Sequence, residues 1–403
     1  MAKTETKGYL SGREIRAIAK ANAREMKRLE AYKNRKAEES EYLAEMKDPE
    51  NILEIEDLHT FFFTEQGVVK AVNGVSYDVP KHSVVGVVGE SGCGKSVTSM
   101  SVMRLIQGPT GQIVDGSIRF KSYEYKRDEK GHPIPTEGKE GAYEMEEKVY
   151  DIAKMPIHEI HRIRGKQIAM IFQEPMTSLN PVFTIGEQLD EVTFINTPGA
   201  TKEMAKARSE EMLRLVGIIP ENVYKAFPHE LSGGMRQRVM IAMALAAEPR
   251  LIIADEPTTA LDVTIQAQIL DLLRDIKDKI DGSILLITHD LGVIAEMADY
   301  VVVMYAGKVI ERGTVYEIFQ DPKHPYTVGL QKSKPTMTLD DTVELYNIPG
   351  NVPNPINMPN HCYFKERCAK CTAKCSGQYP GMVQLSSTHF VACHLYDEEV
   401  GNV

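Results

Sequence analysis

The stretch "GESGCGKS" at Gly89–Ser96 constrains the fold of this chain more than any other feature. It fits the pattern G-x-x-x-x-G-K-[ST], in which glycines let successive backbone N–H groups turn inward around a phosphate. The apolar run "VVGVV" precedes it and "SVTSMSVMRLI" follows, so we expect a strand, a phosphate loop and a helix N-terminus that adds positive charge. The predicted nucleotide-binding residues of this loop are Gly89, Ser91, Gly92, Cys93, Gly94, Lys95, Ser96 and Val97.

Two acids follow a second apolar run, "RLIIADEP", far downstream. At the end of such a strand, Asp255 can hold Mg²⁺ directly or through water, as the Ser96 hydroxyl can from the phosphate loop. Glu256 can then polarise a water for attack on the γ-phosphate. Alone, this stretch could be a strand-end turn with two solvated acids. Together with the phosphate loop, it predicts a site that hydrolyses a nucleoside triphosphate.

A third motif, "LSGGMRQR" at Leu231–Arg238, identifies the kind of nucleotide-binding protein. A Ser-Gly-Gly turn leading into a helix is a second anion-binding N-terminus. Because one phosphate loop already serves the nucleotide of this chain, the second suggests a nucleotide held by another chain. The stretch resembles the LSGGQ signature of ABC-transporter ATPases. From about Leu53 to Gly313, the other motifs of that family follow in order: "IFQEP" with Gln173, "IIADEPTTALD" with Asp262, and "LLITHD" with His289.

The resemblance implies an α/β fold, an ABC-type P-loop ATPase core with a helical subdomain, in which two subunits enclose two ATP molecules. It assigns Glu256 as general base and His289 as a contact of the γ-phosphate. Asp255 joins Ser96 in supporting Mg²⁺. Gln173, the third catalytic residue, contacts Mg²⁺ or the attacking water and also touches the membrane subunit. The signature residues Ser232, Gly233 and Gly234 act on the ATP of the partner subunit.

Aromatic and unusual residues near these motifs add three expectations. Phe62 lies where the family stacks an aromatic ring on adenine, although Phe61 and Phe63 leave the register open. Met235 replaces the usual last Gln of the signature, and Cys93 stands where the phosphate loop usually has Ser. Since the loop N–H groups and a helix N-terminus lower the pKa of a thiol, we expect Cys93 to be reactive; the alternative is that it is a small buried residue that only fills space.

The C-terminal part narrows the resemblance. "HPYTVGL", "IPGNVPNP" and "HCYFKERC" resemble the ATPase subunits of bacterial oligopeptide and dipeptide importers, and nickel importers are close relatives. This implies hydrolysis of ATP coupled to import. It also implies a second, related ATPase as partner, two membrane permease subunits, a peptide-binding protein acting indirectly, and a position on the cytoplasmic face of the membrane.

Other functions of ABC ATPases fit the sequence less well. The enzymes of DNA repair and translation have tandem ATPase domains or a large arm beside the signature. A regulatory nucleotide sensor would lack Glu256 or His289, and both are present. The formal net charge of −10 argues against a nucleic-acid partner.

Five of the six cysteines lie after residue 361. No apolar run approaches the roughly 20 residues that span a bilayer. The N-terminal stretch also lacks the apolar core of a signal peptide. We therefore expect a cytosolic chain, in which clustered cysteines are more often metal ligands than disulfides.

The resemblance adds that many peptide-importer ATPases carry Cys-x5-Cys-x6-Cys and a later Cys. This predicts a [4Fe–4S] cluster on Cys362, Cys368, Cys375 and Cys393. The competing run Cys368, Cys371, Cys375 stays open as a ligand set, and Zn²⁺ with His361 and His394 is the alternative metal.

The domain organisation follows from changes in composition. Residues 1–50 form a charged helical extension, with a capping box "SGRE" and a helix from about residue 12 to 46, either exposed or docked on a partner. Residues 51–330 form the ABC ATPase domain, with a helical subdomain at about 174–245. The charged stretch 121–154 is expected to be a surface insertion. Residues 331–403 form a small, separate Pro- and Cys-rich module that binds metal.

Overall fold

The structure is a computed structural model that describes most of the chain. The described residues are 11–126, 128, 132, 134–136, 143–174, 178–197, 199–259, 261–279, 282–333 and 346–397. Parts of the predicted extension (residues 1–10), surface insertion, helical subdomain (residues 175–177) and C-terminal module (residues 334–345 and 398–403) lie outside these ranges.

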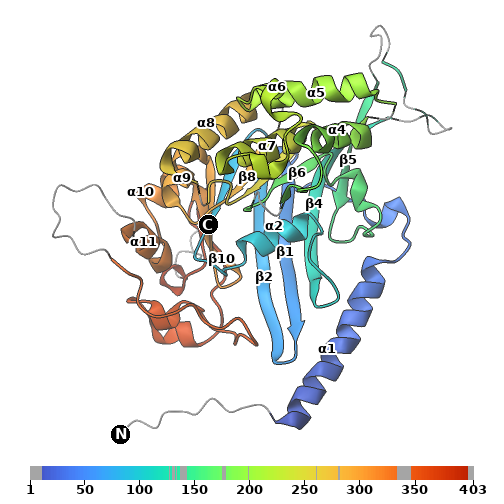
Figure 1. The fold of residues 1–403 in the computed structure, drawn as a ribbon. Helices are drawn as coiled ribbons and strands as arrows, with labels where there is room; N and C mark the ends of the chain where they lie inside the picture. The colour runs from blue at the N-terminus through green and yellow to red at the C-terminus, as the bar shows by residue number, and fades with distance from the viewer. Residues whose placement is uncertain are drawn as a thin grey trace, which may run out of the picture.

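Two β-sheets organise the described part of the chain (Figure 1). The larger sheet has eight strands in the order β11-β12-β10-β9-β3-β8-β7-β6, and β9, β3, β8, β7 and β6 run parallel. The smaller sheet is antiparallel, in the order β2-β1-β4-β5. The strands are β1 Asn51–Thr64, β2 Gly67–Pro80, β3 Val84–Val88, β4 Gly111–Tyr125, β5 Met145–Asp151, β6 Ile168–Ile171, β7 Leu251–Asp255, β8 Ser283–Ile287, β9 Tyr300–Tyr305, β10 Lys308–Thr314, β11 Val383–Gln384 and β12 Phe390–Val391.

Helices cover one face of the larger sheet, and the smaller sheet with α2 covers the other. Every residue of β3, β7 and β8 is buried, which is typical of parallel strands with cover on both sides. One core joins this sheet to α4–α9, and a second lies between the two sheets around α2. The predicted mixed α/β fold is confirmed. The helices are α1 Gly12–Lys33, α2 Lys95–Val102, α4 Ile185–Asn196, α5 Lys202–Leu215, α6 Pro220–Val223, α7 Gly233–Leu245, α8 Val263–Lys279, α9 Leu291–Met297, α10 Val315–Gln320 and α11 Pro325–Lys332.

Helix α1 begins at the predicted capping box but is shorter than predicted. The Ser11 side chain accepts a hydrogen bond from the backbone N–H of Glu14, and the Glu14 carboxylate accepts one from the N–H of Ser11. The helix ends at Lys33, where Asn34 caps it, so the predicted end at residue 46 is wrong. Beyond it, Tyr42 is buried in the core between the sheets.

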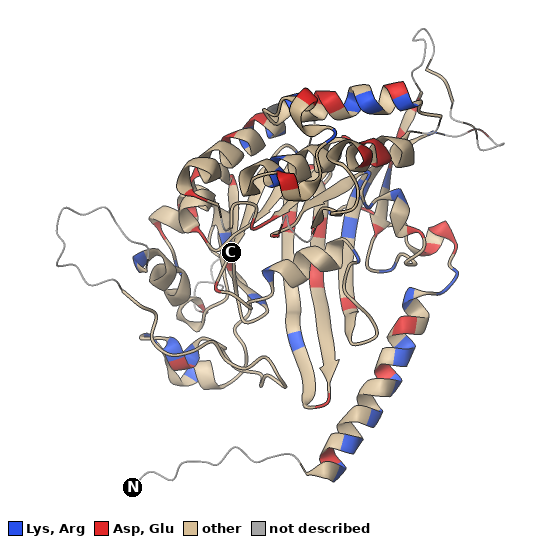
Figure 2. Cartoon of the chain, viewed as in Figure 1, with Lys and Arg blue, Asp and Glu red and all other residues tan. Residues whose placement is uncertain are grey.

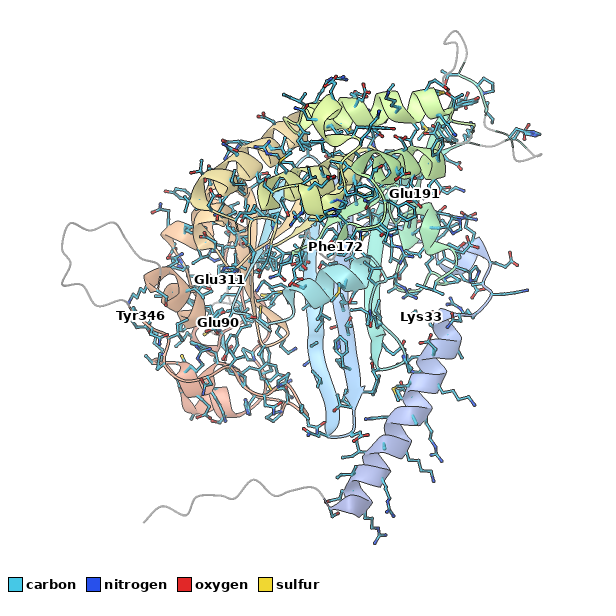
Figure 3. The ribbon with its side chains drawn as sticks, in the orientation of Figure 1. Lys33, Glu90, Phe172, Glu191, Glu311 and Tyr346 are labelled. Carbon is cyan, nitrogen blue, oxygen red and sulfur yellow. The ribbon has the colours of Figure 1, made fainter. Side chains whose placement is uncertain are left out.

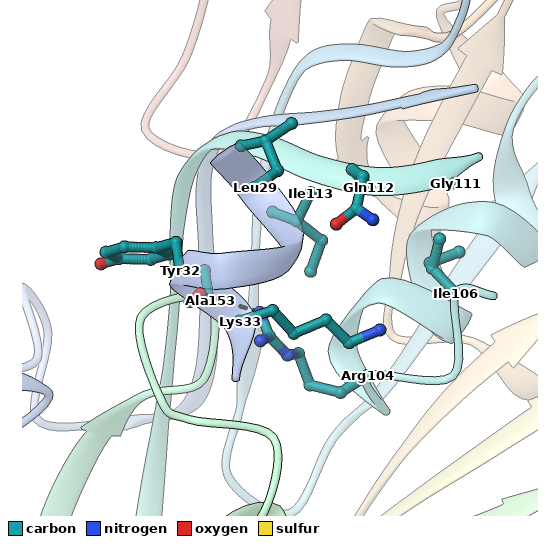
Figure 4. Close-up of a pocket in the computed structure, with 9 residues that line it drawn as sticks. All are labelled: Leu29, Tyr32, Lys33, Arg104, Ile106, Gly111, Gln112, Ile113 and Ala153. Carbon is teal, nitrogen blue, oxygen red and sulfur yellow. Dashed lines mark hydrogen bonds between the residues drawn. The ribbon is translucent and has the colours of Figure 1, made fainter. Parts of the chain in front are cut away.

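One side of α1 packs on the smaller sheet, while charged residues line its length (Figure 2). Leu29 is buried, and the Asn22 side chain donates a hydrogen bond to the backbone oxygen of Thr64. A cavity of about 30 Å³ separates this end of the helix from the buried Arg104 (Figure 4). The helix is therefore partly docked within the chain itself.

The stretch 121–154 is not simply a surface insertion. Strand β4 continues to Tyr125 and pairs with β5, in which Tyr150 is fully buried. The many charged residues suggested an insertion because both strands present a polar face to solvent. Only the residues between them, most of which lie outside the described ranges, remain for an insertion.

The C-terminal segment is built into the main fold. Strand β12 pairs with β10, and Tyr363 and Phe364 are buried in the core of the larger sheet. Ile356 forms a bridge with Val69 of β2. The boundary at residue 331 stays a prediction, but this segment buries more side chains than its loop-rich sequence indicates.

Candidate active site

The phosphate loop joins β3 to α2 in the predicted order. Gly89, Gly92 and Gly94 have positive φ angles of 153°, 77° and 102°. A Cβ at Gly89 would lie 2.2 Å from the backbone oxygen of Met304, and one at Gly94 would lie 2.4 Å from that of Ala71. Glycine is therefore required at Gly89 and Gly94 by close backbone contacts as well as by backbone conformation.

Lys95 and Ser96 link this loop to the end of β7. The Lys95 Nζ donates hydrogen bonds to the backbone oxygens of Gly89 (2.7 Å) and Glu90 (3.2 Å). The Ser96 hydroxyl donates to Asp255 Oδ1 over 3.0 Å. Burial raises the pKa of Asp255, and the bond from Ser96 opposes that shift. Hydroxyl and carboxylate oxygens placed together in this way are suitable ligands for Mg²⁺.

Glu256 contacts the other two predicted catalytic residues, Gln173 and His289. Its Oε2 accepts hydrogen bonds from Gln173 Nε2 and from Thr259 Oγ1, both over 2.9 Å. His289 Nδ1 lies 3.3 Å from Glu256 Oε1. The backbone of Glu256 has a φ of 47°, an uncommon and strained conformation for a non-glycine residue. Gln173, Glu256 and His289 therefore come together from three separate loops.

The signature residues lie at the start of α7, which packs against α4, α5 and β6. Ser232 caps this helix by accepting a hydrogen bond from the N–H of Met235. Ser232 and Gly233 are exposed. Farther along the helix, Gln237 donates to the backbone oxygen of Pro257, next to Glu256. The loss of the usual Gln at Met235 thus leaves the helix cap intact, because the cap uses only the backbone of that residue.

Phe62 lies half-buried in β1, and its ring faces Gly111, where an added Cβ would lie 2.9 Å from it. The neighbouring Phe61 contacts Lys70 and His59 instead. The role of Phe62 at adenine stays a prediction.

The expectation of a lowered pKa at Cys93 is wrong. Burial raises the pKa of the thiol, and only 1% of the residue is exposed. The partial charge of the helix N-terminus does not compensate, because a thiolate here would lose its contact with water.

We expect maleimide to modify Cys93 at most about one tenth as fast as the exposed Cys371, since a buried thiol with a raised pKa reacts slowly. Peptide mass spectrometry after timed treatment of the native protein measures both rates together, with urea-treated protein as the fully accessible reference. Equal rates in native protein would show that the phosphate loop opens readily.

Sequence reasoning missed four residues around the site: Thr259, Glu90, Tyr326 and Arg367. Thr259 lies within a quoted motif, but only the structure shows its bond to Glu256. A cation partner for Glu90 could have been predicted from the sequence, because an acid inside an anion-binding loop requires a nearby positive charge to offset it. That cation, Arg367, lies 277 positions away in the chain.

Comparisons with known proteins agree with this geometry. Residues 72–259 match the family model "ABC transporter", and residues 310–375 match "Oligopeptide/dipeptide transporter, C-terminal region". The oligopeptide transport ATP-binding protein AppD of Bacillus subtilis is 47% identical over 350 residues, covering 86% of this chain and 98% of that protein. This chain belongs to the ATP-binding proteins of oligopeptide and dipeptide ABC transporters.

Other relatives support the same assignment. The oligopeptide transport protein OppD of Bacillus subtilis is 48% identical over 87% of this chain and 91% of its own length. The dipeptide transport protein DppD of the same organism is 45% identical, over 87% of this chain and 96% of its own length. Family membership and the site together show an ATP-hydrolysing subunit of a transporter.

Solved structures show the same fold. The ATP-binding cassette MJ0796, in a dimeric state bound to ADP and Pi, matches with a TM-score of 0.53 and 22% identity, covering 65% of this chain and 98% of that one.

Within the described residues, α1 and the other helices are too short or too polar to cross a membrane.

Proposed function

We propose that this chain is one of two ATPase subunits that power import of oligopeptides or dipeptides through a membrane transporter. The observation that carries the proposal is that the contacts of Ser96 with Asp255 and of Gln173 with Glu256 occur in one chain with the C-terminal region of peptide transporters. AppD, OppD and DppD carry peptide transport in their names.

In this proposal, the phosphate-loop residues bind ATP and Mg²⁺, and Glu256 accepts a proton during hydrolysis. The loop N–H groups and Lys95 hold the phosphates of ATP. Ser96 and Asp255, with Gln173, hold Mg²⁺, which neutralises charge on the phosphate oxygens when it is bound. Glu256 takes a proton from the attacking water as it adds to the γ-phosphorus, and ADP leaves. Thr259 and Gln173 orient the Glu256 carboxylate through their hydrogen bonds.

Closure of two ATPase subunits completes each site in this proposal. Ser232, Gly233 and Gly234 contact the ATP held by the partner, for which the exposure of Ser232 and Gly233 at the start of α7 is suitable. The partner is a related but distinct ATPase, so the pair is a heterodimer. The pair binds two permease subunits at the cytoplasmic face of the membrane, and a peptide-binding protein delivers the solute from the other side.

Peptide stimulation tests the solute class. In the assembled transporter, a binding protein loaded with peptide should raise the ATPase rate, whereas the same protein with Ni²⁺ should not. Stimulation by Ni²⁺ alone would instead assign the chain to a nickel importer.

We further propose that the C-terminal cysteines bind a [4Fe–4S] cluster, with Zn²⁺ as the alternative. Cys375 and Cys393 are buried, whereas Cys371 is exposed. The backbone N–H of Cys362 donates to the oxygen of Cys375 over 3.1 Å. Burial, with the nearby thiols of Cys375 and Cys368, raises the pKa of Cys362 to about 11.

The thiols are not yet arranged as ligands. Across the described ranges, no group of three or more His, Cys, Asp or Glu is placed to hold a metal ion. The proposal therefore requires the cysteine thiols to move together around the metal and to lose their protons as they become thiolate ligands, which couples metal binding to local folding.

Metal analysis after anaerobic purification tests this cluster. We expect four irons and four sulfides per chain, lost in Cys368→Ser and kept in the matched variant Cys371→Ser, because Cys371 is exposed. Stoichiometric zinc would replace the cluster with the alternative metal. Metal-free protein with an ordered C-terminal segment would contradict both.

A further inference from the structure

An ion pair joins the C-terminal segment to the phosphate loop. Arg367 Nη1 donates to Glu90 Oε2 over 2.7 Å, and Nη2 donates to Glu90 Oε1 over 2.9 Å. Glu90 is the second residue of "GESGCGKS" and directly follows the first glycine of the loop. A two-point contact of this kind fixes the orientation of a carboxylate as well as its position.

The arginine is held from every side. Its Nε donates to the backbone oxygen of Pro349 (2.9 Å), and Nη1 also donates to the hydroxyl of Tyr305 (3.3 Å). The side chain of Arg367 is 5% exposed. The hydrogen bonds to the Glu90 carboxylate raise the pKa of Arg367, so it keeps its charge. A buried and fully partnered guanidinium cannot follow the loop if the loop moves.

The backbone of Glu90 is held as firmly as its side chain. Its N–H donates to the hydroxyl of Tyr326 over 2.8 Å, and its oxygen accepts from Lys95 Nζ. Phe364 packs against both Tyr305 and Tyr326, at ring distances of 5.3 and 5.5 Å. Figure 3 places Glu90 beside α11 and the C-terminal segment.

We propose that Arg367 is a positioning residue for ATP binding: it holds Glu90, and through Glu90 it keeps the phosphate loop in the conformation that receives the phosphates. Tyr326 supports the backbone of Glu90 by accepting a hydrogen bond from its N–H, and Phe364 packs on Tyr326. The C-terminal segment, which carries none of the ATP-binding motifs, thereby contributes to nucleotide affinity. Arg367 also directly precedes Cys368, so a rearrangement of the cysteines would reach Glu90 through one side chain.

Nucleotide binding by the full-length chain tests this role. In Arg367→Gln we expect the Kd of a fluorescent ATP analogue to rise about tenfold, because the loop loses a charge-assisted, two-point contact. Arg367→Lys should bind the analogue with intermediate affinity, since lysine keeps the positive charge but cannot make the two-point contact with the carboxylate. The matched control is Arg312→Gln, which removes a partly buried arginine that pairs with Asp78 in β2. The Kd of this control variant for the ATP analogue should stay within about twofold of the wild-type value.

A kinetic comparison separates positioning from a merely structural role. In the assembled transporter, Arg367→Gln should raise the KM for ATP about tenfold and change kcat less, because Arg367 contacts no reacting atom. In a Glu90→Gln background, the same substitution should have little further effect on Kd, since its partner is already neutral. Additive effects would overturn the proposal.

The melting temperature of each variant shows whether it is folded. A folded Arg367→Gln protein with wild-type affinity for ATP would also overturn the proposal. If Arg367→Gln does not fold, Glu90→Gln alone decides the question, because the Glu90 side chain is 29% exposed and the change keeps its shape. Unchanged affinity in Glu90→Gln would contradict the role of the pair.

Discussion

Glu256→Gln should lower the ATPase rate of the assembled transporter at least about 100-fold, because general-base catalysis typically contributes that much or more. ATP binding should persist, since the phosphates are held by the loop and Lys95 rather than by Glu256. The amide keeps the shape of the carboxylate and the contacts to Thr259 and Gln173, so folding should be unaffected. Steady-state hydrolysis and equilibrium nucleotide binding on the same preparation measure the two effects separately.

The control for this variant is Glu211→Gln. Glu211 lies on α5, with its side chain 63% exposed, and pairs with Arg208 at the surface. Its loss should change hydrolysis less than about twofold, as for most exposed ion pairs. Hydrolysis by Glu256→Gln at near the wild-type rate would remove Glu256 from the mechanism.

Gly94→Ala should abolish ATP binding. At a φ of 102°, the added Cβ would lie 2.4 Å from the backbone oxygen of Ala71, so the loop must move away from β2. The positive φ alone costs about 1–3 kcal/mol in a non-glycine residue. The clash with backbone adds to that cost and displaces Lys95 and Ser96, which follow directly. Titration with a fluorescent ATP analogue measures the loss.

The control variant Gly165→Ala separates the effect of backbone strain from the effect of displacing the phosphate loop. Gly165 also has a positive φ, of 75°, but an added Cβ there would meet no atom within 4 Å. It should lower the melting temperature and leave the affinity for ATP within about twofold of the wild type. Tight nucleotide binding by Gly94→Ala would show that the loop tolerates a side chain at that position.

Local patterns in the sequence predicted the central part of the fold. The runs at β3, β7 and β8 are short and apolar, and each is followed directly by a polar motif or a glycine turn. Each forms the buried strand that the pattern indicates. The bonds of Ser96 to Asp255 and of Gln173 to Glu256 join residues that the family resemblance had already named. These residues were predictable because each motif lies at the end of a strand in the same sheet.

The remaining features depend on contacts between distant parts of the chain. Nothing near Arg367 in the sequence indicates that its partner is Glu90. The sequence around Phe364 indicates a loop rich in cysteines, yet Phe364 packs on Tyr305 and Tyr326. Tyr150 follows a charged stretch and is fully buried. A one-dimensional pattern records the polarity of neighbours, whereas burial here is set by elements that meet only in the folded chain.

Uptake of labelled peptide into proteoliposomes tests the central claim most directly. The vesicles contain this chain with its partner ATPase and the two permeases. The peptide-binding protein is added outside, and ATP with Mg²⁺ is enclosed at the face that carries the ATPases. We predict accumulation of peptide that requires enclosed ATP and disappears with Glu256→Gln. Equal accumulation without ATP, or with the Glu256→Gln chain, would contradict the account.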